Sequence, residues 1–318
     1  MKKLGFLVIA LALAFGMSSC GRDGGGAAQG DVIRIAVSMP PILNDFHVAK
    51  FRFVEEGIAA APSNFEFTIF HSTGTDHQVN QLEIIQAQGF DGVIISTLDG
   101  VLMAGPAESI YQAGTPTVVI NRALETNQFT AFVTGSNVEG GENVARYMGN
   151  FLEGQGNIYI MRMAMGTPID AERNDGFLEV MRTEFPGINI IGYSEGGHTI
   201  EFGFEVMQNI LAAHPHIDAI YSHDPFSAMG QEQAIINAGR NDVRLIMSAG
   251  PSQTIAQHMI NNPDTIFRGN FNYPPVMGAE AVRTMVRIFQ GETVPQVYSM
   301  PAELLMIEDV QVWRHLVP

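Results

Sequence analysis

Short runs of apolar residues alternate along the chain with longer segments whose apolar residues recur at helical spacing. Residues 217–239 show one such unit, in which an apolar run at 219–222 meets a polar stop and a helical segment then ends at Gly239. Residues 90–114 repeat this plan. A continuous apolar run without alternation is typical of a strand buried on both faces of a parallel sheet. The pattern therefore predicts two α/β units of similar design.

The same alternation extends over most of the chain. The apolar runs predict strands at residues 32–38, 65–70, 92–96, 117–121, 131–134, 157–163, 188–193, 219–222, 244–247 and 266–271, and a last extended stretch at 297–305. Helices are predicted at residues 44–61, 76–88, 101–113, 138–151, 171–185, 200–213, 227–238, 252–260 and 275–289. This order implies parallel sheets with right-handed crossovers and helices on both faces.

The first 30 residues have a different pattern, typical of export. Lys2 and Lys3 form a basic start, residues 4–16 are apolar, and small residues lead to Cys20. The apolar run is shorter than the ~20 residues of a membrane-spanning helix. The arrangement resembles a bacterial lipoprotein signal, which implies cleavage after residue 19 and lipidation of Cys20. Residues 20–30 are then a flexible tether. The alternative is an ordinary cleaved signal with a chance cysteine.

Composition narrows the possible partners. The formal net charge is −16, and the three lysines of the 318 residues are Lys2, Lys3 and Lys50. Such an anionic surface repels phosphate backbones, so no nucleic acid is expected as a partner. Cys20 is the single cysteine, which excludes an internal disulfide.

Candidate chemistry lies at the ends of the predicted strands, because doubly wound sheets bind ligands beyond the carboxyl ends of their strands. The polar and aromatic residues at these ends are Asn44, Asp45, Phe46, His47, Asn121, Arg122, Asp170, Glu172, Arg173, His198, His223, Asp224, Ser248, Asn270 and Asn272. Amide, carboxylate, guanidinium and aromatic groups in one site suit a neutral polyhydroxylated ligand. The set lacks an evident nucleophile–base pair.

Four of these residues have structural alternatives. Arg122 could pair with an acid that holds a loop, and Asp224 could cap the helix that follows it. Phe46 could belong to the core, and Asn272 to a turn.

Metal and cofactor motifs are weak or missing from the sequence. His214 and His216, like His71 and His77, have no cysteine or acid at ligand spacing. The sequence contains no dinucleotide fingerprint, phosphate loop or nucleophile elbow. We therefore expect neither a metal nor a cofactor.

Several segments together resemble the type I periplasmic sugar-binding proteins, in their ribose/galactose-binding branch. Their second lobe resembles residues 206–246, VMQNILAAHPHIDAIYSHDPFSAMGQEQAIINAGRNDVRLI. The late helix and turn resemble GAEAVRTMVRIFQGETVP, and the first lobe resembles DGVIIS and TPTVVINR. The resemblance covers roughly residues 32 to 307. Lactose-repressor-type regulators share this core but begin with a DNA-binding helix-turn-helix, whereas an export signal stands at that place here.

The resemblance assigns ligand-binding roles by position. It implies an amide at Asn44, a stacking aromatic ring at Phe46 and a guanidinium at Arg122. In the second lobe it implies ligand contacts from His198, at an often aromatic position, and from Asp224 and Asn272.

Three positions depart from the family pattern. Asn121 and Ala249 stand where the family usually has aspartates, and Ala171 stands where sugar binders often have a second arginine. Arg173, two residues further on, is the candidate substitute, and Asn121 stays in the expected site. A hydrogen bond to a charged group contributes ~1.5–3 kcal/mol to binding. Without the two aspartates, the resemblance therefore does not identify which sugar is bound.

The resemblance implies a fold of two doubly wound parallel-sheet lobes joined by a multi-strand hinge. The expected lobes are residues 31–134 plus 273–301 and residues 135–272 plus 302–318. The chain is expected to cross between them near residues 134–136, 271–273 and 300–302.

The function expected from this resemblance is that of an extracytoplasmic solute-binding lipoprotein of an ABC importer. A monomer anchored by its lipid to the bacterial membrane, periplasmic or at the cell surface, would bind a sugar or polyol in the cleft and deliver it unchanged to the permease. One alternative is a ligand-sensing subunit for a chemoreceptor or histidine kinase. Others are a nucleoside or another non-aldose ligand, or an exported hydrolase that uses Asp224 with His223 or Glu172.

Overall fold

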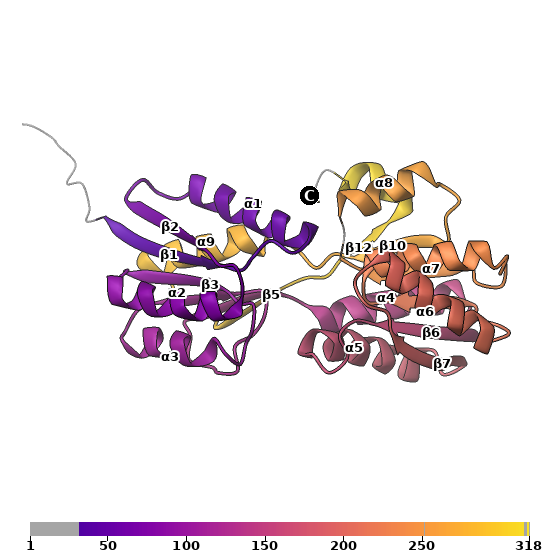
Figure 1. Cartoon of the computed structure of the whole chain (residues 1–318). Helices are drawn as coiled ribbons and strands as arrows, with labels where there is room; N and C mark the ends of the chain where they lie inside the picture. Colours follow the sequence, from indigo (N-terminus) through magenta and orange to yellow (C-terminus); the bar gives the residue numbers. More distant parts are fainter. Residues whose placement is uncertain (1–31, 251, 315–316, 318) are drawn as a thin grey trace, which may run out of the picture. The chain divides into compact units, whose positions relative to one another are not determined.

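The computed structural model describes residues 32–250, 252–314 and 317, and within them the chain forms two six-stranded sheets (Figure 1). The predicted signal peptide, Cys20 and the tether lie outside the described residues. None of the described helices is both long enough and apolar enough to span a membrane. The predicted α/β class with two mostly parallel sheets is confirmed.

The first sheet has the strand order β11-β5-β4-β3-β1-β2, and all its pairs are parallel. Its strands are β1 (Ile33–Met39), β2 (Phe65–His71), β3 (Gly92–Ser96), β4 (Thr117–Ile120), β5 (Ala131–Gly135) and β11 (Val297–Met300). The helices packed with it are α1 (Asp45–Ala59), α2 (Thr75–Gln88), α3 (Ala104–Gln112) and α9 (Met277–Phe289).

The second sheet has the order β12-β10-β9-β8-β6-β7, with β12 antiparallel to β10 and the other pairs parallel. Its strands are β6 (Gly156–Arg162), β7 (Ile188–Glu195), β8 (Ala219–Ser222), β9 (Leu245–Ala249), β10 (Phe267–Phe271) and β12 (Leu304–Met306). The helices of this part are α4 (Asn137–Phe151), α5 (Pro168–Glu184), α6 (Ile200–Ala213), α7 (Pro225–Asn237), α8 (Gln253–Asn261), the 3-10 turn η1 (Ile307–Asp309) and α10 (Val310–Trp313).

Strand β1 shows why the central strands are mostly apolar. Ile35 and Val37 pack in one core cluster, which also contains Val54 of α1. Ala36 belongs to a different cluster, together with Leu82 of α2. Alternate side chains of a strand point to opposite faces, so a strand covered by helices on both faces is apolar at most positions. In β1 the exceptions are Arg34 and Ser38.

The stretch predicted as one extended segment at residues 297–305 is two strands in different sheets. β11 pairs with β5 in the first sheet, and β12 pairs with β10 in the second. Pro301 lies between them and has no amide hydrogen for a sheet ladder, which favours a break at this point.

Helix α5 begins at Pro168, three residues before the predicted start at residue 171. The hydroxyl of Thr167 accepts a hydrogen bond from the Asp170 amide, and a proline in the first turn is compatible with helix geometry. The periodicity of apolar residues did not reveal this cap.

The segments that connect the two sheets are hydrogen-bonded to one another. The Ser136 amide, after β5, donates to the Met300 carbonyl at 3.1 Å, and the Asn272 amide, after β10, donates to the Glu303 carbonyl at 2.7 Å. The Tyr273 hydroxyl lies 3.0 Å from the Thr134 hydroxyl and donates to the Asn121 carbonyl, also at 3.0 Å. These contacts tie each connecting segment to another.

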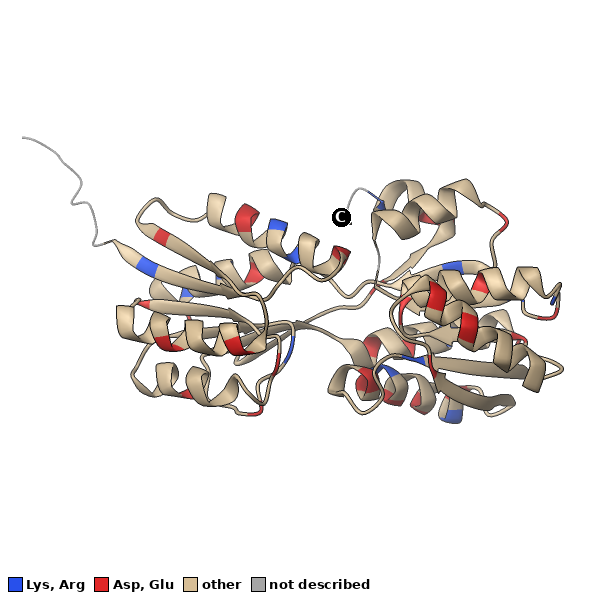
Figure 2. Cartoon of the chain, viewed as in Figure 1, with Lys and Arg blue, Asp and Glu red and all other residues tan. Residues whose placement is uncertain are grey.

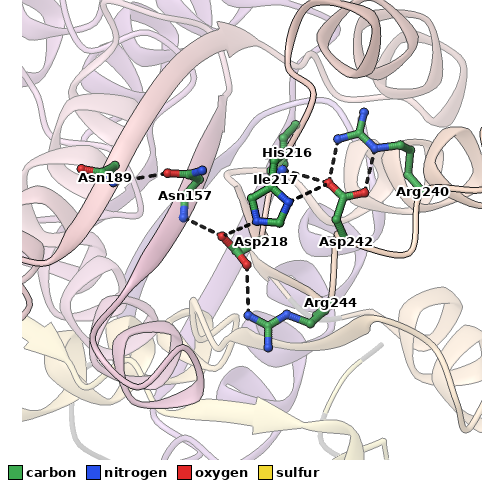
Figure 3. Close-up of polar contacts among 8 residues, drawn as sticks. All are labelled: Asn157, Asn189, His216, Ile217, Asp218, Arg240, Asp242 and Arg244. Atoms are coloured by element: carbon green, nitrogen blue, oxygen red, sulfur yellow. Dashed lines mark hydrogen bonds and ion pairs between the residues drawn. The ribbon is translucent and has the colours of Figure 1, made fainter.

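A cluster of paired charges holds the amino ends of the strands in the second sheet (Figure 3). The Asp218 carboxylate accepts from the Asn157 amide at 2.8 Å and from Arg244 at 3.1 Å. Asp242 accepts from the Ile217 amide at 2.9 Å, and Arg240, 2.7 Å away, holds the pKa of this carboxyl well below its usual range. The cluster thereby fixes the loops that lead into β6 and β8.

Helices α4 and α5 pack so closely that Gly176 has no space for a side chain. A Cβ atom there would lie 2.2 Å from the Val138 carbonyl oxygen. We expect Gly176→Ala to lower the free energy of unfolding by about 1–3 kcal/mol, because the helices must move apart. Urea denaturation measures this change.

The control is Gly74→Ala at the start of α2, where a Cβ would meet no atom within 4 Å and φ is 168°. This variant should change the free energy of unfolding by less than about 1 kcal/mol. Equal stability of the two variants would contradict the close packing of α4 on α5.

Candidate functional site

The loop after β1 brings Asn44 and Phe46 to the start of α1. Asn44 is the N-cap residue, and its side-chain oxygen accepts from the His47 amide at 3.1 Å. The Phe46 ring is half-buried, with its centroid 5.6 Å from that of Tyr273. Asn44 therefore has a structural role in helix α1, while its exposed amide nitrogen is available for another partner.

One turn after Phe46, α1 carries a buried lysine that sequence analysis did not select. The Lys50 side chain is 0% exposed, and its Nζ lies 5.4 Å from the centroid of the Phe46 ring. Among the described residues this nitrogen has no hydrogen-bond partner. Burial, together with the charge of Arg122, lowers the pKa of Lys50 to about 7. The spacing of four residues from Phe46 was the one signal in the sequence, since such pairs share a helix face.

Asn121 and Arg122 follow β4 and differ in exposure. Asn121 is buried, with φ at 76°, a left-handed conformation that asparagine tolerates better than most residues. Arg122 is exposed, and its Nη1 donates to the Leu98 carbonyl at 3.0 Å. Among the ion pairs of the described residues, Arg122 has no acidic partner. The structure therefore does not support the alternative that Arg122 pairs with an acid to hold a loop.

In the second sheet, α5 positions the buried Arg173. Its Nη1 donates to the His223 carbonyl at 2.6 Å, and its Nε donates to the Asn137 side-chain oxygen at 3.0 Å. The guanidinium carbon lies 5.1 Å from the centroid of the Phe271 ring. Burial lowers the pKa of Arg173 from its ordinary value, and nearby tyrosine and aspartate groups oppose this effect. Arginine remains charged under such conditions.

His223, at the end of β8, is held by Asp170. Its Nδ1 lies 3.0 Å from the Asp170 carboxylate, which Arg162 also binds at 3.2 Å. Burial lowers the pKa of His223 to about 4 in spite of this carboxylate, so the ring is neutral at pH 7. With Asp170 accepting the Nδ1 proton, Nε2 is left as an acceptor. Among the described residues this buried Nε2 has no partner.

Asp224, selected from the sequence, caps helix α7. One carboxylate oxygen accepts from the Ser227 amide at 2.9 Å, and the other lies 3.4 Å from Nδ1 of His198. His198 is exposed, and Asp224 raises its pKa above the ordinary value. The structure therefore confirms the alternative that Asp224 caps the helix after it. Ligand contacts by Asp224 and His198 stay predictions.

Two asparagines at the end of β10 have unpaired side chains. Asn270 is 0% exposed, and neither its side-chain nitrogen nor its oxygen has a partner within the described residues. The Asn272 side-chain oxygen is likewise buried and unpaired there. Both asparagines are among the strand-end candidates of the sequence, and the family resemblance assigns a ligand contact to Asn272.

The structure groups the predicted residues into two sets. Around α1 and β4, Phe46 lies near Lys50, and Arg122 acts on Lys50 electrostatically. Around β8, Arg173 contacts His223, and Asp224 interacts with Arg173 electrostatically. Tyr273 borders both sets, because its ring lies 5.6 Å from the Phe46 ring and 5.9 Å from the Arg173 guanidinium.

Within the part of the chain that the structure describes, no group of three or more His, Cys, Asp or Glu side chains could hold a metal ion. His216 instead pairs with Asp218 at 3.2 Å.

Residues 35–293 match the periplasmic binding protein domain family, and the chain belongs to this family. The ribose import binding protein of Escherichia coli (strain K12) is 23% identical over 309 residues, which cover 96% of this chain and 99% of that protein. The xylitol-binding protein of Mycolicibacterium smegmatis is 25% identical over 252 residues, which cover 77% of this chain and 69% of that protein.

A solved structure of a periplasmic solute-binding protein from Actinobacillus succinogenes, with bound D-allose, has the same fold. The TM-score is 0.76 at 20% identity, and the match covers 88% of this chain and 99% of that one. The fold of a type I periplasmic binding protein, inferred above from sequence resemblance, is thereby confirmed.

The neutral His223 makes stability depend on pH. Its pKa of about 4 lies below the ordinary 6.5, so between these values the unfolded state binds a proton that the folded state does not. We expect the free energy of unfolding to fall, by roughly 2–3 kcal/mol, as the pH drops from 6.5 to 4. His47, also with a pKa of about 4, adds a change in the same direction. Urea denaturation between pH 4 and 7 measures this slope.

Because His223→Asn removes one of these two titrations, the slope should become smaller but not vanish. His198→Asn is the control, because the raised pKa of His198 gives the opposite sign. An unchanged slope in His223→Asn would show that His223 titrates normally in the folded protein.

Proposed function

We propose that this protein is the extracytoplasmic solute-binding component of an ABC importer and binds a sugar or polyol. Membership in the periplasmic binding protein family supports this, as do relatives named for ribose import and xylitol binding. The observation that carries the proposal is the position of the unpaired buried polar atoms. Those of His223, Asn270 and Asn272 lie at or just after the carboxyl ends of β8 and β10, where doubly wound sheets bind ligands.

Each side of the site has groups suited to a hydroxylated ligand. Near β8, Nε2 of neutral His223 and the side-chain oxygen of Asn272 accept hydrogen bonds from ligand hydroxyls, and Arg173 donates. Near α1, Asn44 and Arg122 bind ligand oxygens and the Phe46 ring stacks on the apolar face of the sugar. Asn121, His198 and Asp224 complete the proposed contacts. The charge-assisted bonds from the two arginines are the strongest of these.

We propose that residues 31–134 plus 273–301 form one lobe and residues 135–272 plus 302–318 the other. The lobes close around the ligand, because contacts from both lobes stabilise the closed state relative to the open state. The permease then recognises the closed form, and the ligand leaves unchanged. The monomer is exported through its signal peptide and held at the membrane by a lipid on Cys20.

The proposal predicts a specific ligand-dependent stabilisation. A thermal-shift screen of the mature protein against pentoses, hexoses, polyols and nucleosides should reveal a compound that raises Tm. At a concentration 100 times its Kd, such a ligand adds ~2.7 kcal/mol to the free energy of unfolding. Absence of any shift from hydroxylated compounds would overturn the proposal.

Arg122→Ala should weaken that ligand by roughly 10- to 150-fold, because a hydrogen bond to a charged group contributes ~1.5–3 kcal/mol. The exposed position of Arg122 means that the variant should fold normally. Arg182→Ala is the matched control, since Arg182 is 71% exposed at the end of α5 and pairs with Glu179. Isothermal titration calorimetry distinguishes the two, and equal affinities would show that Arg122 is not in the site.

A further inference from the structure

Lys50 is the one lysine of the described chain, and its environment is unusual for a cation. The side chain projects from α1 and is fully buried. Among the described residues its ammonium nitrogen has no hydrogen-bond or ionic partner, and it lies 5.4 Å from the centroid of the Phe46 ring. Burial of an unpaired charge is strongly unfavourable. A buried lysine without a hydrogen-bond acceptor or an anionic partner among the described residues is a candidate for binding an external group.

The charges around Lys50 are positive. The electrostatic effect on Lys50 comes from Arg122, and both Lys50 and Arg122 act on His47. None of the ion pairs of the described residues includes Lys50. The same edge of the first sheet also has two buried hydroxyl groups without hydrogen-bond partners in the described part of the chain, those of Ser96 at the end of β3 and of Thr97 directly after it. Lys50, Arg122 and these two hydroxyl groups thus form a set of hydrogen-bond donors with no anionic acceptor among the described residues.

We propose that the ligand carries a carboxylate, which Lys50 and Arg122 bind, so that the solute is a polyhydroxy acid of the aldonate or uronate class. This inference rests on the function proposed above and narrows its ligand. A carboxylate accepts charge-assisted hydrogen bonds from both cations, and thereby compensates the buried charge of Lys50. The sugar hydroxyls then remain for Arg173 and His223 in the second sheet.

Two sequence departures agree with a negative ligand. Asn121 and Ala249 stand where the family resemblance implies aspartates. Asn121 precedes Arg122 directly, so an aspartate there would neutralise the arginine and repel a carboxylate. The amide and the methyl group carry no charge, which leaves the cations free for an anionic ligand.

The start of α1 favours a carboxylate over a phosphate. Phosphate sites at helix N-termini use free backbone N–H groups. Here the Asn44 side chain already accepts from the His47 amide, and Asp45 adds a negative charge in the first turn. The charged donors are side chains, Lys50 and Arg122, which suit a single carboxylate.

The test compares matched acids and neutral sugars on the mature protein by isothermal titration calorimetry. The panel contains aldoses, the corresponding aldonates and uronates, polyols, and phosphorylated sugars. We expect one of the carboxylates to bind at least 10-fold more tightly than its neutral counterpart. Tighter binding of the neutral sugar, or of the phosphorylated sugar, would overturn the inference while leaving the solute-binding function intact. A panel in which nothing binds would overturn both.

Lys50→Met tests the residue itself. The variant keeps the volume of the side chain and removes the buried charge, so we expect a higher Tm without ligand and 10- to 100-fold weaker binding of the acid. Affinity for the neutral sugar should stay within a factor of about 2 to 3.

Arg52→Met is the matched control, because Arg52 lies two residues further along α1, half-exposed and paired with Glu56 at 3.3 Å. This variant should bind the acid as the wild type does. If Lys50→Met retained the full preference for the acid, Lys50 would not be the group that binds the carboxylate.

Discussion

Helices cover both faces of each sheet, so polar side chains can meet a ligand chiefly where the strands end. This constraint explains the distribution of polar groups in the described chain. The central strands are apolar at nearly every position, and the polar residues of β8 and β10 lie at their ends or just beyond them. The same constraint separates the parts of the chain that stabilise the fold from those available for binding.

The two edges of the second sheet illustrate this separation. At the amino ends of its strands, Asp218 and Asp242 are fully engaged with arginines and backbone amides, which fixes the loops (Figure 3). At the carboxyl ends, His223 and Asn270 have buried polar atoms without partners in the described chain. Unpaired buried groups lower stability, so their presence at one edge is typical of a binding site.

The charge distribution shows the same division. Acidic residues outnumber basic ones along the helices (Figure 2), and the net charge is −16. Near α1, however, Arg122 acts on Lys50 electrostatically, and neither residue has an acidic partner among the ion pairs of the described residues. A cationic site in an anionic protein can discriminate among solutes by charge as well as by shape, because the acidic surface is solvated and screened while Lys50 is buried.

The sequence alone determined the alternation of strands and helices, the α/β class and the family, because these depend on local periodicity and on motifs along the chain. It also placed the candidates at strand ends, since the topology of parallel sheets requires this. The tertiary structure decided which of those residues is unpaired. Asp224 caps its own helix, whereas the neighbouring His223 is buried and neutral, because Asp170 and Arg173 come from a helix some fifty residues away. Lys50 was missed for the same reason. A lysine in a helix is expected to be exposed, and only the tertiary structure shows that Lys50 is buried and that Arg122 acts on it.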